Sequence, residues 1–179
     1  MLKIIVPAIE KWDEDRQEFL STKETELCLE HSLVSVSKWE SKWHKYFIGN
    51  NNLTSEMLID YIRCMTMTQN VDPDIFYAID EETMTKIKDY ISDSQTATWF
   101  SENNDKHGRD IITSEIIYYW MIALQIPFEC QKWHLNRLLT LIRVCNEKNQ
   151  PEKKMSQSEV MRRNREINEA RRRALKTRG

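Results

Sequence analysis

The sequence predicts a mainly α protein, a single compact helical domain with a basic C-terminal helix, and its N-terminus allows a small β-hairpin. Only 3 glycines and 4 prolines occur in 179 residues, whereas an all-β sandwich or barrel needs many more turn residues. Apolar residues recur at three- and four-residue spacing through most of the chain, which is typical of amphipathic helices. Hydrophobic residues make up 40% and charged residues 30% of the chain, a composition that favours a folded, polar protein.

The first half of the chain divides into short strands followed by capped helices. The segments 2–6 and 25–29 are predicted as strands because they are short and apolar or alternating. A helix is predicted from Ser32, a good N-cap residue, to near Gly49. Three further helix starts are predicted at Thr54 or Ser55, at Pro73 and after Asp80.

The second half contains the most apolar segment of the chain. A helix starting at Thr113 or Ser114 is apolar on nearly every side up to Ile126, so we predict that it is the central buried helix. The segment 128–145 is predicted as a second helix that forms a core hairpin with it. The polar segment 101–110 is predicted as a long loop.

Charge separates a body, residues 1–150, from a C-terminal arm, residues 151–179. The arm holds ten Lys and Arg against four Asp and Glu, and the body holds 16 against 24. Ser156 and Glu159 form a capping box for a helix that runs to about Leu175. Because the apolar stripe of this helix is thin, we expect the arm to dock weakly or to order on a partner.

No pattern in the sequence predicts an enzyme, so no catalytic residue, cofactor or metal is assigned. Three glycines cannot build a phosphate-binding loop, and the four cysteines show no paired spacing. Cys130 and His134 could offer two zinc ligands at a four-residue spacing, but a structural site needs four. A core cysteine beside a histidine bonded to the backbone is therefore the favoured interpretation.

Aromatic and arginine side chains are the predicted partner-binding residues. The chain has 6 tryptophans, and tryptophan and arginine are enriched at protein interfaces. The Trp39 and Trp43 pair, with lysines beside it, could also stack on nucleic acid, although a core position is favoured. The predicted set is Trp39, Trp43, Trp120 and Trp133 for the fold and an interface, and Arg162, Arg163, Arg171, Arg172 and Arg173 for the arm.

Nothing in the sequence predicts a membrane segment. The N-terminal apolar run is too short for a signal peptide, and no stretch approaches the roughly 18 apolar residues of a membrane span. A cytosolic location is expected.

Several segments resemble small proteins encoded in the tail-gene region of tailed bacteriophages, and most of all the tail assembly chaperones. They are SVSKWESKWHKYF, DYIRCMTMTQNVDP, TATWF and ITSEIIYYWMIALQIPFECQKWHLNRLLTLIRVC, and the similarity extends from about Glu26 to Gly179. The resemblance implies a non-enzymatic, largely helical protein of the host cytoplasm. It would bind the tape measure protein, keep its apolar helices in solution and recruit tail tube subunits, with self-association left open.

Two alternatives remain. A structural virion component, such as a connector or tail-completion protein, would order the basic arm against neighbouring subunits and would be present in the particle. A nucleic-acid-binding protein is less favoured, because the acidic body would repel the polyanion that the arm attracts. Neither alternative involves a small-molecule substrate or a membrane.

Overall fold

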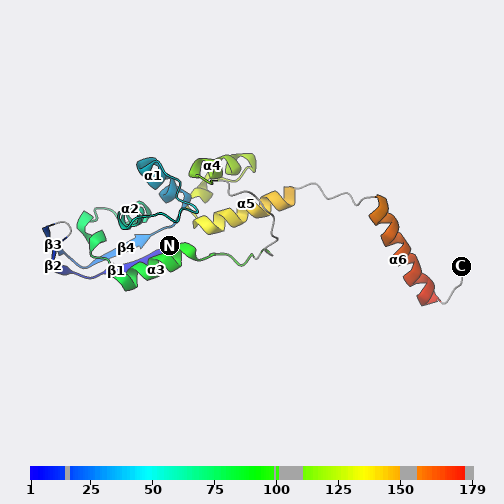
Figure 1. Cartoon of the computed structure of the whole chain (residues 1–179), viewed down its shortest axis with the longest axis horizontal. Helices are drawn as coiled ribbons and strands as arrows, with labels where there is room; N and C mark the ends of the chain where they lie inside the picture. Colours follow the sequence, from blue (N-terminus) through cyan, green and yellow to red (C-terminus); the bar gives the residue numbers. More distant parts are fainter. Residues whose placement is uncertain (15–16, 99, 101–110, 150–156, 176–179) are drawn as a thin grey trace. The chain divides into compact units, whose positions relative to one another are not determined.

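The computed structural model describes residues 1–14, 17–98, 100, 111–149 and 157–175 (Figure 1). The chain is mainly helical with a small N-terminal β-hairpin, which confirms the predicted fold class. Two compact units, Met1–Asn146 and Glu147–Gly179, are described separately below. The elements of the first unit are β1 (Leu2–Val6), β2 (Ile9–Asp13), β3 (Glu18–Thr22), β4 (Thr25–Leu29), α1 (Leu33–Trp43), α2 (Ser55–Met65), the 3-10 helix η1 (Pro73–Tyr77), α3 (Glu81–Ser92), α4 (Ser114–Ala123), the 3-10 helix η2 (Phe128–Lys132) and α5 (Leu135–Asn149), which extends past the boundary.

The four strands form one antiparallel hairpin made of two ladders. Strand β1 pairs with β4, as the two predicted segments imply, and β2 pairs with β3. Val6 lies opposite Thr25 and Ile9 opposite Thr22, so the register is unchanged across the break at Pro7. Proline cannot donate to a ladder hydrogen bond, which accounts for the break at this point. We call β2 and β3 the distal hairpin; the sequence did not predict it.

Helices α1, α2 and α3 start at the predicted caps. Thr54 Oγ1 accepts from Met57 N at 3.3 Å, and Asp80 Oδ1 accepts from Thr83 N at 2.8 Å. Ser32 caps α1 through a capping box with Ser35. The predicted extent of α1 to Gly49 is wrong, because His44 takes the left-handed conformation (φ 51°) and ends the helix. The predicted loop 101–110 lies outside the described residues.

Alternate residues of the β1–β4 ladder are buried against the helices. Ile4 and Val6 of β1 and Leu27 and Leu29 of β4 enter the core. Helix α3 lies against β1, while α1 contacts α2, α4 and η2 (Figure 1). The largest side chains that are fully buried include Trp39, Tyr61, Leu33, Ile62, Met65, Ile87, Ile117 and Met121.

Two buried histidines lie at the centre of the first unit. The rings of His31 and His134 are 5.0 Å apart in an edge-to-face arrangement. His31 Nδ1 shares a hydrogen bond with the Tyr61 hydroxyl, and His134 Nε2 donates to Tyr90 O at 2.9 Å. Burial, followed by the neighbouring His134, lowers the pKa of His31 to about 3. Burial also lowers the pKa of His134 and raises that of Tyr61, so this centre is neutral at pH 7.

The segment before α5 differs from the predicted continuous helix over 128–145. Residues Phe128–Lys132 form η2, and Trp133 is extended. His134 makes an isolated β-bridge with Ser32, and Leu135 N donates to His31 O at 2.8 Å. A long-range contact therefore takes the backbone groups that a continuous helix would use.

Among the described residues, none of the helices is both long and apolar enough to cross a membrane.

Candidate functional site: the outer face of helix α4

A buried carboxylate fixes the start of α4. Glu40 of α1 is 8% exposed, and its Oε2 accepts from Ser114 N at 2.8 Å. Its other oxygen accepts from Phe47 N at 2.9 Å. The Glu40 side chain thus supplies an acceptor for an otherwise unbonded N–H of the first turn, where the helix dipole also favours negative charge. It joins α1, the segment after it and α4.

We expect Glu40→Gln to lower the free energy of unfolding by about 1–3 kcal/mol. The amide has one acceptor oxygen in place of two, so one of the two backbone N–H groups would be left buried without a partner. Urea denaturation followed by circular dichroism measures the effect. Glu56→Gln, on the exposed first turn of α2, is the matched control, expected to cost less than about 1 kcal/mol. Equal losses in the two variants would contradict this role of Glu40.

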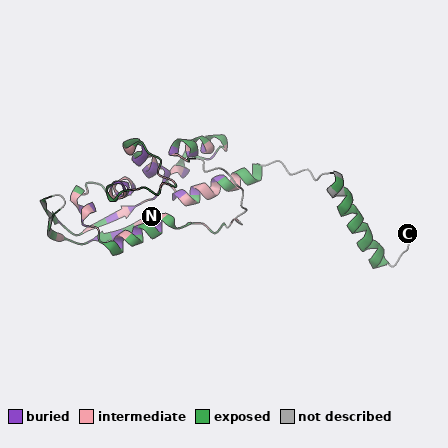
Figure 2. Cartoon of the chain, viewed as in Figure 1, coloured by how far each residue is buried: buried purple, intermediate pink, exposed green. Residues whose placement is uncertain are grey.

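Helix α4 is buried on one side only, which corrects the prediction of a central buried helix. Ser114, Ile117 and Met121 face the core, and Figure 2 shows exposed residues along the same helix. The exposed side chains are large and apolar: Ile116 is 36%, Tyr119 66% and Ile122 61% exposed. Spacing of three places them in one row. We call these three residues the α4 outer face.

Apolar side chains continue beyond both ends of the α4 outer face. Ile111 is 57% exposed and Phe128 51% exposed, and the rings of Phe128 and Tyr118 are 6.4 Å apart. Glu115 is the single charged residue in 111–128. Hydrogen bonds from its own backbone and from the Thr113 side chain lower the pKa of its carboxyl. An apolar surface of this kind, with so little charge, is typical of a protein-binding site.

Trp39 and Trp43 belong to an aromatic cluster inside the body. Trp39 was predicted to serve the fold and an interface; it is fully buried and its Nε1 donates to Met57 O at 2.8 Å, so its ring belongs to the core and offers no exposed surface to a partner. Its ring stacks on that of Trp43, with 6.2 Å between the ring centres, and meets the Phe47 ring edge to face, with 5.2 Å between the centres. Trp43 is half-buried, and its Nε1 donates to Asp60 Oδ2 at 2.8 Å. This pair serves the fold.

Trp120 and Trp133 lie nearer the surface. Trp120 is half-buried on α4, and Trp133 is half-buried with the Arg137 guanidinium 4.3 Å from its ring centre. Among the described aromatic contacts, neither ring joins the Trp39 cluster. The predicted cluster of four tryptophans therefore divides into a core pair and two separate residues, of which Trp120 adjoins the α4 outer face.

The predicted arginines lie on α6 (Gln157–Leu175), in the second unit. Arg162, Arg163, Arg171, Arg172 and Arg173 are all exposed. Arg162 pairs with Glu166 and Arg173 with Glu169, each at 3.8 Å and one helical turn apart, so each contributes little to stability. Met161, Ile167 and Leu175 are exposed as well, which leaves α6 without a buried face among its described side chains.

Comparison with protein-family models, curated proteins and solved structures gives no match, so function is argued from the chain itself. His134 bonds to the backbone, as predicted, and Cys130 is buried in η2. Within the described ranges, no three His, Cys, Asp or Glu side chains are grouped to hold a metal. The α4 outer face is the candidate site.

Proposed function

We propose that this protein is a non-enzymatic assembly factor that binds apolar helices of a partner protein through the α4 outer face. The observation that carries the proposal is the exposed row of Ile116, Tyr119 and Ile122. An amphipathic helix binds such a row through its own apolar residues at spacings of three and four. Glu115 is the single charged residue within 111–128, which favours a partner segment that is itself uncharged on the contacting side.

The resemblance to tail assembly chaperones names the partner within this proposal. The partner is the tape measure protein, whose long apolar helices need cover before the tail is built. The exposed arginines of α6 are suited to an acidic surface, since arginine forms bidentate pairs with carboxylates. We propose that these arginines recruit tail tube subunits by binding an acidic surface on them.

Co-expression with a tagged tape measure protein from the same gene neighbourhood tests the proposal. The native chain, untagged, is expected to co-purify with the partner and keep it soluble. Ile122→Lys and Tyr119→Lys place a charge on the α4 outer face, and each should reduce the recovered complex at least about tenfold, since burying an unpaired charge costs several kcal/mol. Ile5→Lys is the matched control, because Ile5 of β1 is 63% exposed.

Four results would contradict the proposal. The partner could remain insoluble with the native chain, or the α4 variants could bind as well as the control variant. Detection of the chain in purified particles would favour the virion component in its place. Retention of DNA that is lost on deleting residues 151–179 would favour nucleic-acid binding.

A further inference from the structure

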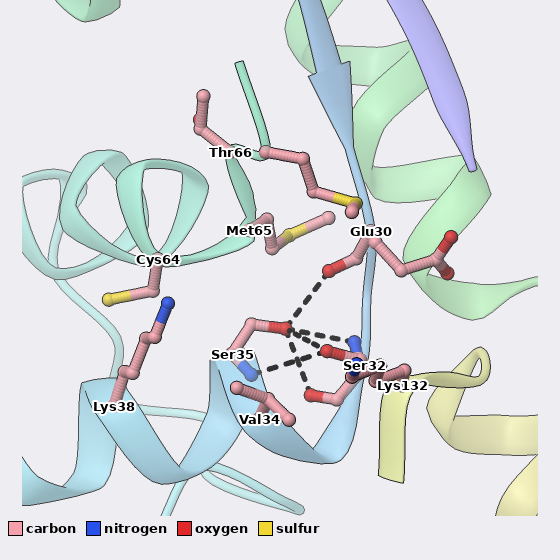
Figure 3. Close-up of a pocket in the computed structure, with 10 residues that line it drawn as sticks. Glu30, Ser32, Val34, Ser35, Lys38, Cys64, Met65, Thr66 and Lys132 are labelled. Carbon is pink, nitrogen blue, oxygen red and sulfur yellow. Dashed lines mark hydrogen bonds between the residues drawn. The ribbon is translucent and has the colours of Figure 1, made fainter. Parts of the chain in front are cut away.

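A pocket of about 330 Å³ lies where the start of α1 meets the end of α2 (Figure 3). Its volume is at the lower end of the range for ligand pockets in proteins. Apolar atoms form much of its lining, and the residues that the argument uses are Val34, Cys64, Met65 and Met67, with Lys38 and Lys132 beside them. Burial raises the pKa of the Cys64 thiol, so this side chain is neutral at pH 7 and counts with the apolar lining.

The hydroxyl groups of the pocket are engaged within the protein. Ser35 Oγ lies 2.9 Å from Glu30 O and accepts from Ser32 N at 2.9 Å. Thr66 Oγ1 donates to Ile62 O at 2.8 Å. These hydroxyls hold the β4–α1 connection and the end of α2, and they are poorly placed to bind a ligand as well.

The carboxylate of Glu30 is also engaged elsewhere. Its Oε1 accepts from the Tyr90 hydroxyl at 2.7 Å, and its Oε2 lies 3.0 Å from the amino group of Met1. Figure 3 shows this carboxylate directed away from Ser35 and Lys38. It therefore does not neutralise the lysines that line the pocket.

The two lysines are exposed, and neither has an ion pair within the described part of the chain. Met67 beside them is 60% exposed. The pocket thus combines an apolar lining with an open, positively charged margin. An open margin suits a chain segment that crosses the surface better than a small molecule that must be enclosed.

We propose that this pocket binds a segment of a partner protein in which one apolar side chain is flanked by acidic residues. The apolar side chain contacts Val34, Met65 and Met67, and its acidic neighbours pair with Lys38 and Lys132. Charge complementarity selects this partner over a neutral or basic one. The site is separate from the α4 outer face, and the proposal does not depend on the function assigned to that face.

The test uses the ¹⁵N-labelled full chain and blocked peptides, with binding read from backbone NMR shifts. The first peptide is Gly-Glu-Leu-Glu-Gly; the second replaces Glu with Gln, and the third replaces Leu with Ala. We expect saturable shifts at Val34, Lys38, Cys64 and Thr66 with the first peptide, and at least about fivefold weaker binding of the other two. N-acetyl-leucine, a free small carboxylate, should bind more weakly than the first peptide.

The doubly substituted Lys38→Glu, Lys132→Glu chain should bind the first peptide at least about tenfold more weakly than the native chain. Lys88→Glu, on the exposed side of α3, is the matched control and should bind normally. All three lysines are exposed, and the dispersion of the NMR spectrum verifies that each variant is folded. Shifts confined to other surfaces, equal binding of the Glu and Gln peptides, equal or tighter binding of N-acetyl-leucine, or an unaffected lysine variant would overturn the proposal.

Discussion

Replacing Trp39 by alanine is expected to lower the free energy of unfolding by about 3–5 kcal/mol. The indole is fully buried, stacks on Trp43, meets Phe47 edge to face and donates to Met57 O. Alanine would leave a cavity and would remove the hydrogen bond that the indole donates to Met57 O. Because domains of this size are stable by only about 5–15 kcal/mol, this loss is a large share of the total stability. Urea denaturation measures the loss.

Trp12→Ala is the comparison that separates a core tryptophan from an exposed one. Trp12 lies opposite Phe19 in the distal hairpin and is 58% exposed, so its loss should cost less than about 1 kcal/mol. Trp39→Phe keeps a ring in the core but loses the hydrogen bond. Its loss of unfolding free energy should lie between those of Trp12→Ala and Trp39→Ala. Losses of similar size for Trp12→Ala and Trp39→Ala would contradict the core position of Trp39.

The buried histidine pair should make the body unstable in mild acid. The pKa of His31 is about 3 in the folded chain against an ordinary value of 6.5. As the pH falls below 6.5, the unfolded chain binds a proton that the folded chain cannot, so stability is full above pH 6.5 and is lost down to about pH 3. The expected slope approaches about 1.4 kcal/mol per pH unit. His134, whose pKa is also lowered, adds to the loss.

The slope is best measured between pH 6.5 and 5, above the ordinary range for carboxylates. In this window His31→Phe, which removes the titrating ring, should reduce the dependence of the unfolding free energy on pH. His44→Asn is the control, because His44 is exposed and asparagine tolerates its left-handed backbone. A slope unchanged by His31→Phe but reduced by His44→Asn would contradict the assignment.

Local signals in the sequence were sufficient to locate most elements. The strands 2–6 and 25–29 match β1 and β4, and the caps at Ser32, Thr54 and Asp80 start the predicted helices. These features depend on residues close together in the chain, such as a side-chain oxygen two or three residues before the N–H that it caps. The distal hairpin was missed because its strands carry many charged residues and little β-branched character.

Features that depend on distant residues could not be predicted. An apolar helix is buried on all sides or presents one side to a partner, and the composition of 114–126 is the same in both cases. The exposure of Tyr119 and Ile122 shows that this helix is not buried on all sides; that the exposed side binds a partner is our proposal. That Glu40 caps the start of α4 was also missed. The available signal was that Glu40, next to Trp39, is a charged residue at an apolar position of a predicted helix.

The bridge between Ser32 and His134 joins two parts of the body that are synthesised at different times. It joins the start of α1 to the start of α5, so the hairpin and the first three α-helices must wait for the synthesis of residues near 134 before their core closes. Until then the rings of His31 and Tyr90 lack their contact with the ring of His134. Closing so large a loop is entropically costly and slows folding. Nascent chains on the ribosome should therefore expose apolar surface until translation has passed α5, the period in which they are most open to aggregation.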